Sequence, residues 1–540
     1  MWFLVCLWLA SATAATAFDP SQYSNSTRLH ATSYTLYWRT DERYIYLGFE
    51  VRTRGWIGFG LSEPSTGSMI GSDMLVSEVT GGGVGPRIVR DMYATEFAWP
   101  SEDACGQDWE LLAYESDVTS TYLEVARLLD TGDVAQDRAI VPGPMKIVFA
   151  WGAGNVVSYH SGQVGAHTVS FIEPSPAGTS PVALPGDAYA VAVAMVEVPV
   201  AAGRDYAYYC KSFELPLAAQ QHHVVQVDLI ADPNTAHVLQ HLNLYICDNS
   251  TALGDNYVLK YAGVGGECSV PALGNPASGC HSLMVAWARG MTSVVLPQEA
   301  GFFVGAASSR HVVLEAHYSR TSSVVYDDSG LRLWVTPSLR QHNAATLLLG
   351  DPLLSLSPPI PPRVSLEHYE TECPSVCTER LHSSLHVFGA SAHLRQVGAQ
   401  IWTSHHAAST GELLGYIDRH DYYDTNYHAI NPASFVVHPG DRLNTHCTYT
   451  TTSRTNETAF ALGSADEICL HILFYYPATA APSDPAAPFV FCGHHPDPSA
   501  TLCGSNSGIG DGSSVITAYP NPSVTDPVDD RAREFGGSCQ

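Results

Sequence analysis

Apolar and polar residues alternate in short runs along this chain, and a period of two is typical of β-strands. Two such runs, residues 34–38 and 44–51, lie on either side of the polar segment Thr40-Asp41-Glu42. Side chains of a strand point to opposite faces in turn, so each run can bury one face. The pattern therefore predicts an antiparallel hairpin near the start of the chain.

Strand-like runs recur in the rest of the chain, and the Lys and Glu runs that favour helices are absent. The runs are 224–230, 242–247, 312–317, 385–388, 435–437 and 469–476. Proline-rich stretches at 173–185 and 358–362 predict linkers between domains. Past Pro477 the sequence is rich in Pro, Ser and Asp, which predicts a mostly irregular tail held by its cysteines.

Composition agrees with an all-β protein of several domains. A chain of 540 residues is too long for one hydrophobic core, and its length suggests about three domains. It is 45% hydrophobic and only 15% charged, with 44 Gly and 34 Pro, which suits a turn-rich β protein better than a helical one. The net charge of -27 argues against binding to nucleic acid or to anionic lipid.

Several features predict an exported protein. Residues 1–17 are typical of a secretory signal peptide, with an apolar core and small residues before the cleavage position, although no Lys or Arg precedes the core. No later segment has the ~18 consecutive apolar residues of a membrane span. We therefore expect a protein that is secreted or lumenal in the secretory pathway.

Cysteines and glycosylation triplets agree with export. Without Cys6, which lies in the signal peptide, twelve cysteines remain, and in an oxidising compartment they predict up to six disulfides. Asn25, Asn249 and Asn456 each begin an Asn-x-Ser/Thr triplet, which is a glycosylation acceptor. The sequence by itself does not assign the cysteine pairs.

Two motifs follow the predicted hairpin. Residues 55–60 read Gly-Trp-Ile-Gly-Phe-Gly, and 69–73 read Met-Ile-Gly-Ser-Asp. Their order is similar to that of the DOMON domain, a β-sandwich, and the resemblance covers residues 30–172. Some DOMON domains bind a metal or a haem-like ligand, which makes Asp73 and His160 candidates. The simpler interpretation is that Asp73 stabilises a turn and His160 lies on the surface.

Eight landmarks occur in a fixed order between residues 208 and 477. They are Tyr209-Cys210, His222-His223, Gln240-His241, Leu314-Glu315-Ala316-His317-Tyr318, Cys373-Pro374-Ser375-Val376-Cys377, His386-Val387-Phe388, Pro439-Gly440-Asp441 and Tyr475-Tyr476-Pro477. This order resembles the core of the copper type II, ascorbate-dependent monooxygenases, the family of dopamine β-hydroxylase. The resemblance implies a linker at 173–189, two jelly-roll-like β-sandwich domains at 190–357 and 358–480 with one copper each, and a disulfide-tethered tail at 481–540.

The resemblance also implies how the cysteines pair and what the family does. The implied pairs are Cys210–Cys268, Cys247–Cys280, Cys373–Cys492, Cys377–Cys503, Cys447–Cys469 and Cys105–Cys539, which use all twelve cysteines. The family reaction is hydroxylation of a C–H bond in a small-molecule substrate by oxygen, with ascorbate as the reductant. Two coppers take part, one that transfers electrons and one that activates oxygen.

The electron-transfer copper of the family lies on three histidines, an adjacent pair and one from a later strand. His241 and His317 match two of these positions, and Gln240 replaces the first member of the pair. A glutamine carbonyl is a harder and weaker ligand for copper than an imidazole. We therefore expect weak copper binding that involves His241 and His317.

The oxygen-activating copper of the family lies on a His-x-His pair and a methionine. His393 matches the first histidine, whereas Arg395 and Ile468 replace the other two ligands. Arginine stays protonated and has no lone pair to donate, and the strand period would point Arg395 toward the ion. We expect no oxygen activation of the family type, and we assign no catalytic residue.

Other histidines are candidates for substitute ligands. His222-His223 looks like an adjacent ligand pair, but its place in the order matches an upstream pair, so a structural role is expected. His471 lies three residues after Ile468, and odd spacing on a strand puts it on the opposite face. The remaining candidates are His237, His386 and the pair His405-His406.

Three hypotheses follow. The first is a secreted family member whose hydroxylase activity is lost or impaired, with copper weak or absent. The second is an active monooxygenase with unorthodox copper ligation, which would use ascorbate and a small-molecule substrate. The third is an extracellular adhesion or scaffold protein. Copper content of the purified protein discriminates between the first two, and the sequence indicates neither a substrate nor an oligomeric state.

Overall fold

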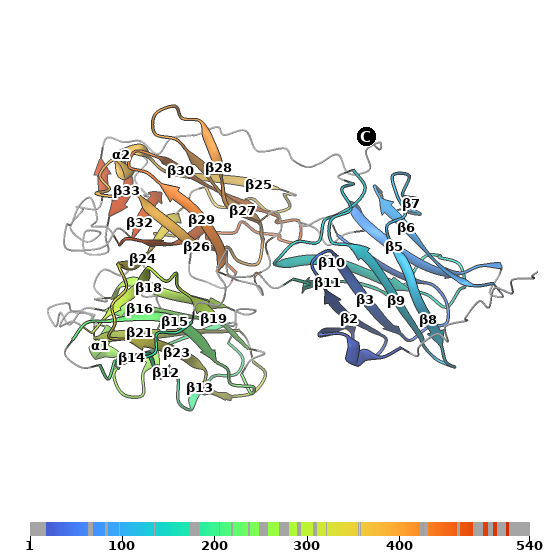
Figure 1. Ribbon diagram of the computed structural model, residues 1–540, viewed down its shortest axis with the longest axis horizontal. Coiled ribbons are helices and arrows are strands. Elements are labelled where there is room, and N and C mark those ends of the chain that lie inside the picture. The colour runs from blue at the N-terminus through green and yellow to red at the C-terminus, as the bar shows by residue number, and fades with distance from the viewer. Residues whose placement is uncertain are drawn as a thin grey trace, which may run out of the picture. The chain divides into compact units, whose positions relative to one another are not determined.

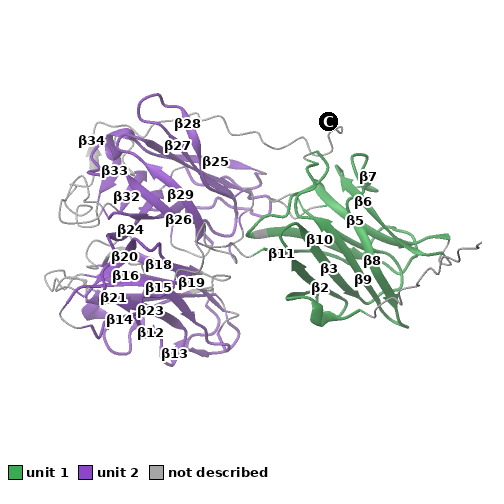
Figure 2. Ribbon diagram, in the orientation of Figure 1, with its two compact units in different colours: residues 1–173, 527–540 green, residues 174–526 purple. Residues whose placement is uncertain are grey.

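The computed structural model describes most of the chain. The described residues are 18–62, 69–81, 85–96, 98–133, 135–172, 183–204, 206–217, 220–235, 238–247, 257–268, 280–288, 293–305, 310–319, 321–354, 356, 358–364, 366–420, 423, 425, 430–461, 465–478, 490–494, 500–504 and 515–517. The chain divides into two compact units, residues 1–173 with 527–540 and residues 174–526 (Figure 2). The predicted signal peptide lies outside the described residues.

Almost all regular structure is β-strand, which confirms the predicted all-β fold (Figure 1). The helical elements of the described residues are single turns: η1 Pro20–Gln22, α1 Tyr257–Lys260 and α2 Ser375–Thr378. Neither described α-helix approaches the length of the apolar helix that a bilayer requires.

The first unit is a sandwich of two sheets. One sheet has the order β1-β2-β3-β9-β8, with bounds β1 Asn25–His30, β2 Tyr34–Thr40, β3 Tyr44–Val51, β8 Glu110–Ser116 and β9 Thr121–Leu128. The other has the order β11-β10-β4-β5-β6-β7, with bounds β4 Ile57–Leu61, β5 Ser72–Val79, β6 Arg87–Ala94, β7 Ser101–Glu102, β10 Pro144–Trp151 and β11 Val164–Ser170. Strands β2 and β3 form the predicted hairpin.

Alternation of side chains explains this packing. Tyr34, Leu36 and Trp38 of β2 point into the sandwich core, while the residues between them are half-buried. They pack against apolar side chains of the second sheet, among them Phe59 and Phe149. The apolar face of each sheet is therefore buried by the other, as a sandwich requires.

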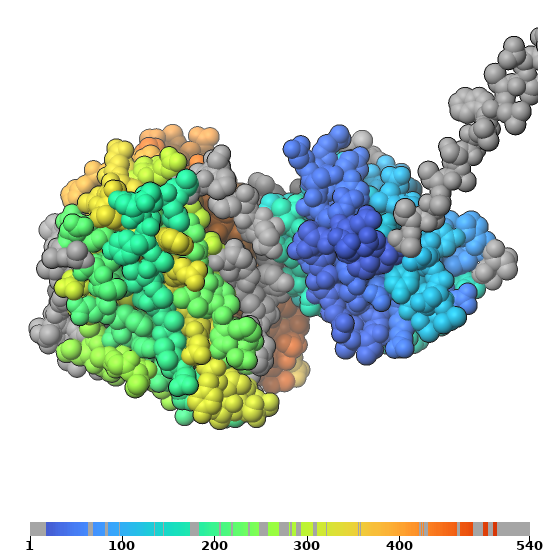
Figure 3. Space-filling model, turned by 60° about the horizontal axis from the view of Figure 1, so that its bottom comes forward, coloured from blue at the N-terminus to red at the C-terminus, as the bar shows by residue number. Residues whose placement is uncertain are grey.

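The second unit contains four sheets. The large sheet has the order β12-β23-β15-β20-β24-β31-β26-β29, with β19 and β32–β34 beside it; its bounds are β12 Tyr189–Ala194, β15 His222–Ile230, β19 Ser293–Val295, β20 Ala300–Val304, β23 Gly330–Thr336, β24 His342–Gly350, β26 Leu385–His393, β29 Asn431–Val437, β31 Leu470–Tyr476, β32 Phe491–His494, β33 Ala500–Gly504 and β34 Val515–Thr517. Figure 3 shows yellow atoms of late residues between green atoms of earlier ones, as the order β12-β23-β15 requires.

Three smaller sheets pack against the large one. A five-stranded sheet has the order β17-β14-β21-β16-β18, with bounds β14 Tyr206–Glu214, β16 Leu239–Cys247, β17 Gly266–Glu267, β18 Cys280–Ala288 and β21 His311–Ser319. A four-stranded sheet has the order β25-β30-β27-β28, with bounds β25 Glu367–Cys373, β27 Gly398–His406, β28 Leu413–His420 and β30 Arg442–Tyr449. The third is the pair of β13 Val198–Val200 and β22 Val325–Asp327.

The large sheet joins the two predicted core domains. Strand β20 pairs in parallel with β24, and β24 pairs antiparallel with β31. Strand β24 therefore belongs to the sheet of the second domain, although the predicted boundary at residues 357/358 assigned it to the first. The proline-rich stretch 358–362 is no exposed joint, since Ile360 is fully buried and bridges to Thr458.

The predicted irregular tail is partly wrong. Strand β32 pairs with β24, and β33 pairs with both β32 and β34, so residues 491–494 and 500–504 extend the large sheet. Their side chains are almost all buried. The high Pro and Ser content concealed these short strands, because their apolar runs are only a few residues long.

Five of the implied disulfides are present. They are Cys210–Cys268, Cys247–Cys280, Cys373–Cys492, Cys377–Cys503 and Cys447–Cys469. Cys105 is also disulfide-bonded, but its implied partner Cys539 lies outside the described residues. Of the predicted glycosylation acceptors, Asn25 and Asn456 are exposed, and Asn249 lies outside the described residues.

Candidate metal centre

Two predicted ligands lie side by side on neighbouring strands. His241 of β16 is paired with His317 of β21, and their ring centres are 4.7 Å apart. On the next strand, Tyr208 of β14 is paired with His317 and stacks on its ring at 4.3 Å. The five-stranded sheet therefore aligns Tyr208, His317 and His241 in one row, and the two histidines of the first half-site are brought together.

A β-bulge explains how an adjacent ligand pair can work on a strand. Leu239 is paired with Tyr318 and His241 with His317, so Gln240 is an extra residue without a partner in the ladder. Neighbouring residues of a regular strand point to opposite faces, but a bulge redirects one of them. Sequence reasoning did not identify the bulge, since a bulge is defined by the partner strand.

Gln240 lies beside His241 but has no imidazole nitrogen to bind a metal. The side chain is half-buried, and its Nε2 donates over a long 3.5 Å to the carbonyl of Val238. Its only metal ligand would be the amide oxygen, which copper binds less well than an imidazole nitrogen. The first half-site therefore offers two imidazoles.

The third predicted ligand comes from the other half of the unit. His393 is the last residue of β26, and its ring centre lies 5.6 Å from that of His241. The two residues are separated by about 150 positions in the sequence, and only the tertiary fold places them together. His241 thus contacts one histidine of its own sheet and one from the neighbouring domain.

The argument that the strand period would aim Arg395 at a metal is wrong. Strand β26 ends at His393, and Arg395 lies in the turn that leads to β27, so alternation along a strand does not apply to it. The backbone N–H of Arg395 donates to Glu467 at 2.8 Å, and that of Val397 donates to the same carboxylate at 2.7 Å. The Glu467 carboxylate therefore holds this turn.

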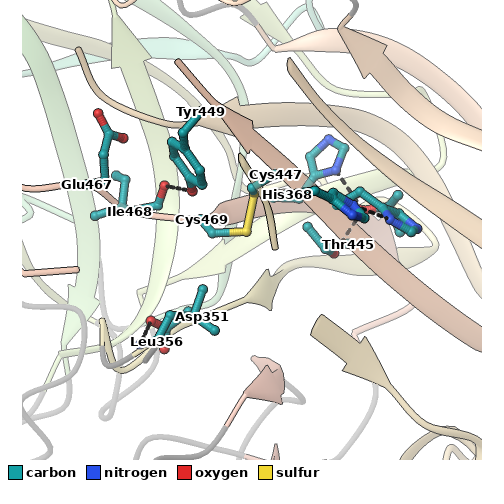
Figure 4. The surroundings of a disulfide bond; sticks show 12 residues. Asp351, Leu356, His368, Thr445, Cys447, Tyr449, Glu467, Ile468 and Cys469 are labelled. Atoms are coloured by element: carbon teal, nitrogen blue, oxygen red, sulfur yellow. Dashed lines mark hydrogen bonds between the residues drawn. A yellow bond between two sulfur atoms is a disulfide. The ribbon is translucent and has the colours of Figure 1, made fainter. Parts of the chain in front are cut away.

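Glu467 is a residue that the sequence analysis missed. Burial raises its pKa to about 7, although the two backbone N–H groups and the charge of Arg395 act to lower it. It immediately precedes Ile468, and both lie beside the Cys447–Cys469 disulfide (Figure 4). The sequence shows only that Glu467 precedes a proposed ligand position. Its full burial, which identifies it as important, is visible in the structure alone.

Ile468 offers no donor to a metal at its side chain. It is 2% exposed, and its carbonyl oxygen accepts a 2.8 Å hydrogen bond from the Tyr449 hydroxyl (Figure 4). An aliphatic side chain has no lone pair, whereas the thioether that the family has here is a soft ligand for cuprous ion. The second half-site thus offers one imidazole, that of His393.

The His222-His223 pair is engaged in hydrogen bonds. The backbone N–H of Arg340 donates to Nδ1 of His223 at 3.0 Å, so Nε2 carries the proton and donates to Asn343 at 2.9 Å. Burial lowers the pKa of His223, which favours this neutral ring. With both nitrogens in use, His223 has no lone pair for a metal, and these contacts support a structural role.

The remaining substitute ligands are placed elsewhere. His471 is paired with Ala392, and its ring contacts Thr403 at 2.8 Å and Asp418 at 3.1 Å, on the face opposite to His393. Strand β31 begins at Leu470, after Ile468, so the spacing argument from Ile468 does not apply. His386 stacks on Tyr476. His405 contacts Asp441 and His406 contacts Ser404, while His237 lies outside the described residues.

Asp73 lies in strand β5, so the interpretation that it stabilises a turn is wrong. Its carboxylate is buried and paired with Arg127 at 2.5 Å, and Asp91 and Asp137 lie beside it. Burial and the neighbouring carboxylate charges raise the pKa of Asp91 to about 9 and that of Asp137 to about 7, although the charge of Arg127 acts to lower both. His160 is half-buried, and its ring lies 4.8 Å from that of Tyr159 in a tilted arrangement.

Comparisons with known proteins agree with this architecture. The sequence pattern of the copper type II ascorbate-dependent monooxygenase N-terminal domain matches residues 190–324, that of the C-terminal domain matches 342–500, and that of the DOMON domain matches 30–152. DBH-like monooxygenase protein 1 of Gallus gallus is 30% identical over 460 residues, which cover 83% of this chain and 72% of the relative. This chain belongs to the copper type II ascorbate-dependent monooxygenase family.

Other family members are similar over most of their length. DBH-like monooxygenase protein 1 of Homo sapiens is 29% identical over 490 residues, 88% of this chain and 77% of the relative. Dopamine beta-hydroxylase of Equus caballus is 28% identical over 439 residues, 78% of this chain and 68% of the relative. The C-terminal family pattern begins at residue 342, the first residue of β24, which agrees with the sheet pairing of that strand.

The residues of this chain do not fit the family's two coppers. The first half-site has two imidazoles and an amide, and the second has one imidazole, an arginine in a turn and a buried isoleucine. Thioether and imidazole donors suit copper, and the second half-site has one of them where the family has three. We therefore derive no reaction step through a pair of coppers.

Proposed function

We propose that this protein is a secreted member of the family that does not hydroxylate substrates by the two-copper route and acts as a binding protein on the family scaffold. The observation that carries the proposal is the donor set. Three of the six family ligand positions are occupied by Gln240, Arg395 and Ile468. The two coppers must exchange an electron, so the loss of either site is enough to stop the family reaction.

The second half-site supports the proposal most strongly. The carboxylate of Glu467 holds the turn that carries Arg395, and the Ile468 side chain is packed in a dry environment beside a disulfide. Rebuilding an oxygen-activating site there would need a new imidazole and a new thioether.

Export is supported by the covalent structure. Five disulfides are present in the second unit, and disulfides persist in oxidising compartments. The exposed Asn25 and Asn456 side chains are accessible to a glycosyltransferase. Secretion from a eukaryotic expression host, with glycan on these residues by mass spectrometry, is the expected result.

Oxygen uptake tests the proposed loss of activity. The full chain is supplied with copper, ascorbate and oxygen, together with phenethylamines and glycine-extended peptides, and dopamine β-hydroxylase in parallel verifies the reagents. We expect no substrate-dependent uptake and no hydroxylated product. Product formed by the unsubstituted protein would overturn the proposal and favour unorthodox copper ligation.

Substitutions locate the cause of the loss. Gln240→His completes the first half-site only, and Arg395→His with Ile468→Met addresses the second only. Because the family reaction needs both sites, we expect neither variant to gain activity. The triple variant alone carries all six family ligand types. Activity in the single Gln240→His variant would show that the second half-site is functional as it stands.

A further inference from the structure

The three family histidines that this chain keeps do not stay in two separate sites. His241 and His317 belong to the first half-site and His393 to the second, yet His241 lies next to both of the others. The rings come from β16, β21 and β26, which are three strands of two different sheets. One histidine cluster therefore spans the junction of the two core domains.

The spacing of the rings suits a shared ion. Imidazole nitrogens bind a first-row metal at ~2.0–2.1 Å, which places the centres of two rings on one ion roughly 5–6 Å apart. The two measured separations from His241 are 4.7 and 5.6 Å. The ring nitrogens of all three do not lie within 4.8 Å of one another, so side-chain rotation must bring them onto the ion.

Burial of the cluster is compatible with metal entry. His241 is 9% exposed, and His317 and His393 are half-buried, so the rings are shielded but not sealed. Tyr208 stacks on His317 and limits the orientations of that ring. The three backbone positions are fixed on strands, so binding requires rotation of side chains but no rearrangement of the backbone.

The charges near His393 do not forbid a cation. Arg395 is two residues away, but the Glu467 carboxylate lies close enough to Arg395 for the two charges to interact. The backbone N–H of Arg395 is itself tied to that carboxylate at 2.8 Å. The arginine charge is thus partly compensated by the Glu467 carboxylate.

The donor set also indicates which ion. In the family the thioether favours cuprous ion, and this chain has Ile468 in that position. Three neutral imidazoles without a thioether suit Zn²⁺ as well as copper, and Zn²⁺ has no geometric preference of its own. A site of this kind binds a metal without selecting the redox-active one.

The geometry points to a single three-histidine site, formed by His241, His317 and His393 at the junction of the two core domains, that holds one Zn²⁺ or cuprous ion per chain. This inference deepens the proposed function and rests on it, since it reuses the remnants of two copper sites as one binding site. The ion would join β16 and β21 of one domain to β26 of the other.

Metal titration tests the site. The metal-free full chain is titrated with Zn²⁺, and separately with cuprous ion, against a chromophoric chelator of known affinity. We expect one equivalent of either ion, and at least a tenfold loss of affinity in each of His241→Ala, His317→Ala and His393→Ala. His386→Ala is the matched control, because this exposed histidine is on the same strand β26, and it should bind as the unsubstituted chain does.

His393→Ala decides between one shared site and the family's first half-site. Undiminished affinity in this variant, binding of two cuprous ions, or no binding of Zn²⁺ would each overturn the shared site. Thermal unfolding of the metal-free variants verifies that they fold. None of the results that would overturn the shared site bears on the proposed function. Only product formation in the oxygen assay would overturn the proposed function.

Two further measurements do not depend on a variant. X-ray absorption of the Zn²⁺ complex should show three imidazole nitrogens, and two would refute the shared site. Hydrogen exchange should slow on Zn²⁺ addition in peptides that contain β26 as well as in those that contain β16 and β21. Protection confined to β16 and β21 would assign the ion to the first half-site alone.

Discussion

The two half-sites of this protein differ in how the fold places their candidate ligands. In the first, His241 and His317 are paired on neighbouring strands, beside the bulge at Gln240. The second keeps His393, but its other two positions are a turn held by Glu467 and a buried isoleucine. The difference shows that paired strands place two side chains opposite each other directly, whereas residues in a turn or loop are placed by long-range contacts such as those of the Glu467 carboxylate.

Removal of a disulfide should have the largest effect on stability. It should destabilise both the first half of the second unit, which carries His241 and His317, and the second half, which carries His393. Cys210–Cys268 closes 58 residues in the first half and Cys447–Cys469 closes 22 in the second. Loop-closure entropy predicts a loss of about 4 and about 3 kcal/mol for the paired Cys→Ser variants. Urea unfolding measures both.

A chelator is the control for the disulfide variants. A chelator removes at most one bound ion, and the stabilisation by that ion depends on the free metal concentration. The free energy of unfolding of the metal-free chain should therefore not change when chelator is added. Unfolding of the first half by the chelator but not by a reductant would show that a structural metal, and not the disulfides, stabilises that half.

Glu467→Ala should damage the second half selectively. The variant leaves the partly buried N–H group of Arg395 and the buried N–H group of Val397 without their carboxylate acceptor. Each unsatisfied buried donor costs ~1–3 kcal/mol, so we expect a loss of about 3 kcal/mol. Glu457→Ala, at an exposed position, is the control. Hydrogen exchange should accelerate in β26 and β27 but not in β16, and equal acceleration in both would contradict the assignment.

Acid should also distinguish the second half. Burial alone would raise the pKa of Asp418, but His420 and His471 lower it well below its ordinary value. The folded pKa is thus below the unfolded one, so this carboxylate contributes stability above about pH 4 that is lost as the pH falls further.

Asp418→Asn tests this source of acid sensitivity. The variant should be less stable than the unsubstituted chain at pH 7 and should lose less stability between about pH 5 and about pH 3. Urea midpoints at each pH measure the difference. Identical pH profiles of the two proteins would show that Asp418 does not carry the effect.

Gln240→His should have the smallest effect and is the most direct test of the intact bulge. Residue 240 is the extra residue beside His241, so a new imidazole there adds a ligand to an existing row. We expect about a tenfold rise in Zn²⁺ affinity, or ~1.4 kcal/mol. Arg395→His, in the turn after β26, should raise it less. Equal gains in competition titrations would show that both positions face the metal.

Local sequence determined much of this architecture. Strand-like patterns predicted the β2–β3 hairpin and the strand that carries His317, whereas the predicted runs 242–247 and 385–388 covered only parts of β16 and β26 and stopped short of His241 and His393. Such patterns can be read because the alternation of buried and exposed side chains is a property of each strand by itself. The identity of a ligand is equally local, so the replacements at Gln240, Arg395 and Ile468 could be seen in the sequence.

Only the tertiary structure decided how these parts combine. The bulge at Gln240 exists through the register with β21, and the end of β26 at His393 removes Arg395 from the strand period. Glu467 acts on a turn some 70 residues away. The contact of His241 with His393 joins strands of separate domains, and such contacts arise from sheet pairing and packing over long sequence separations, which no local pattern of residues encodes.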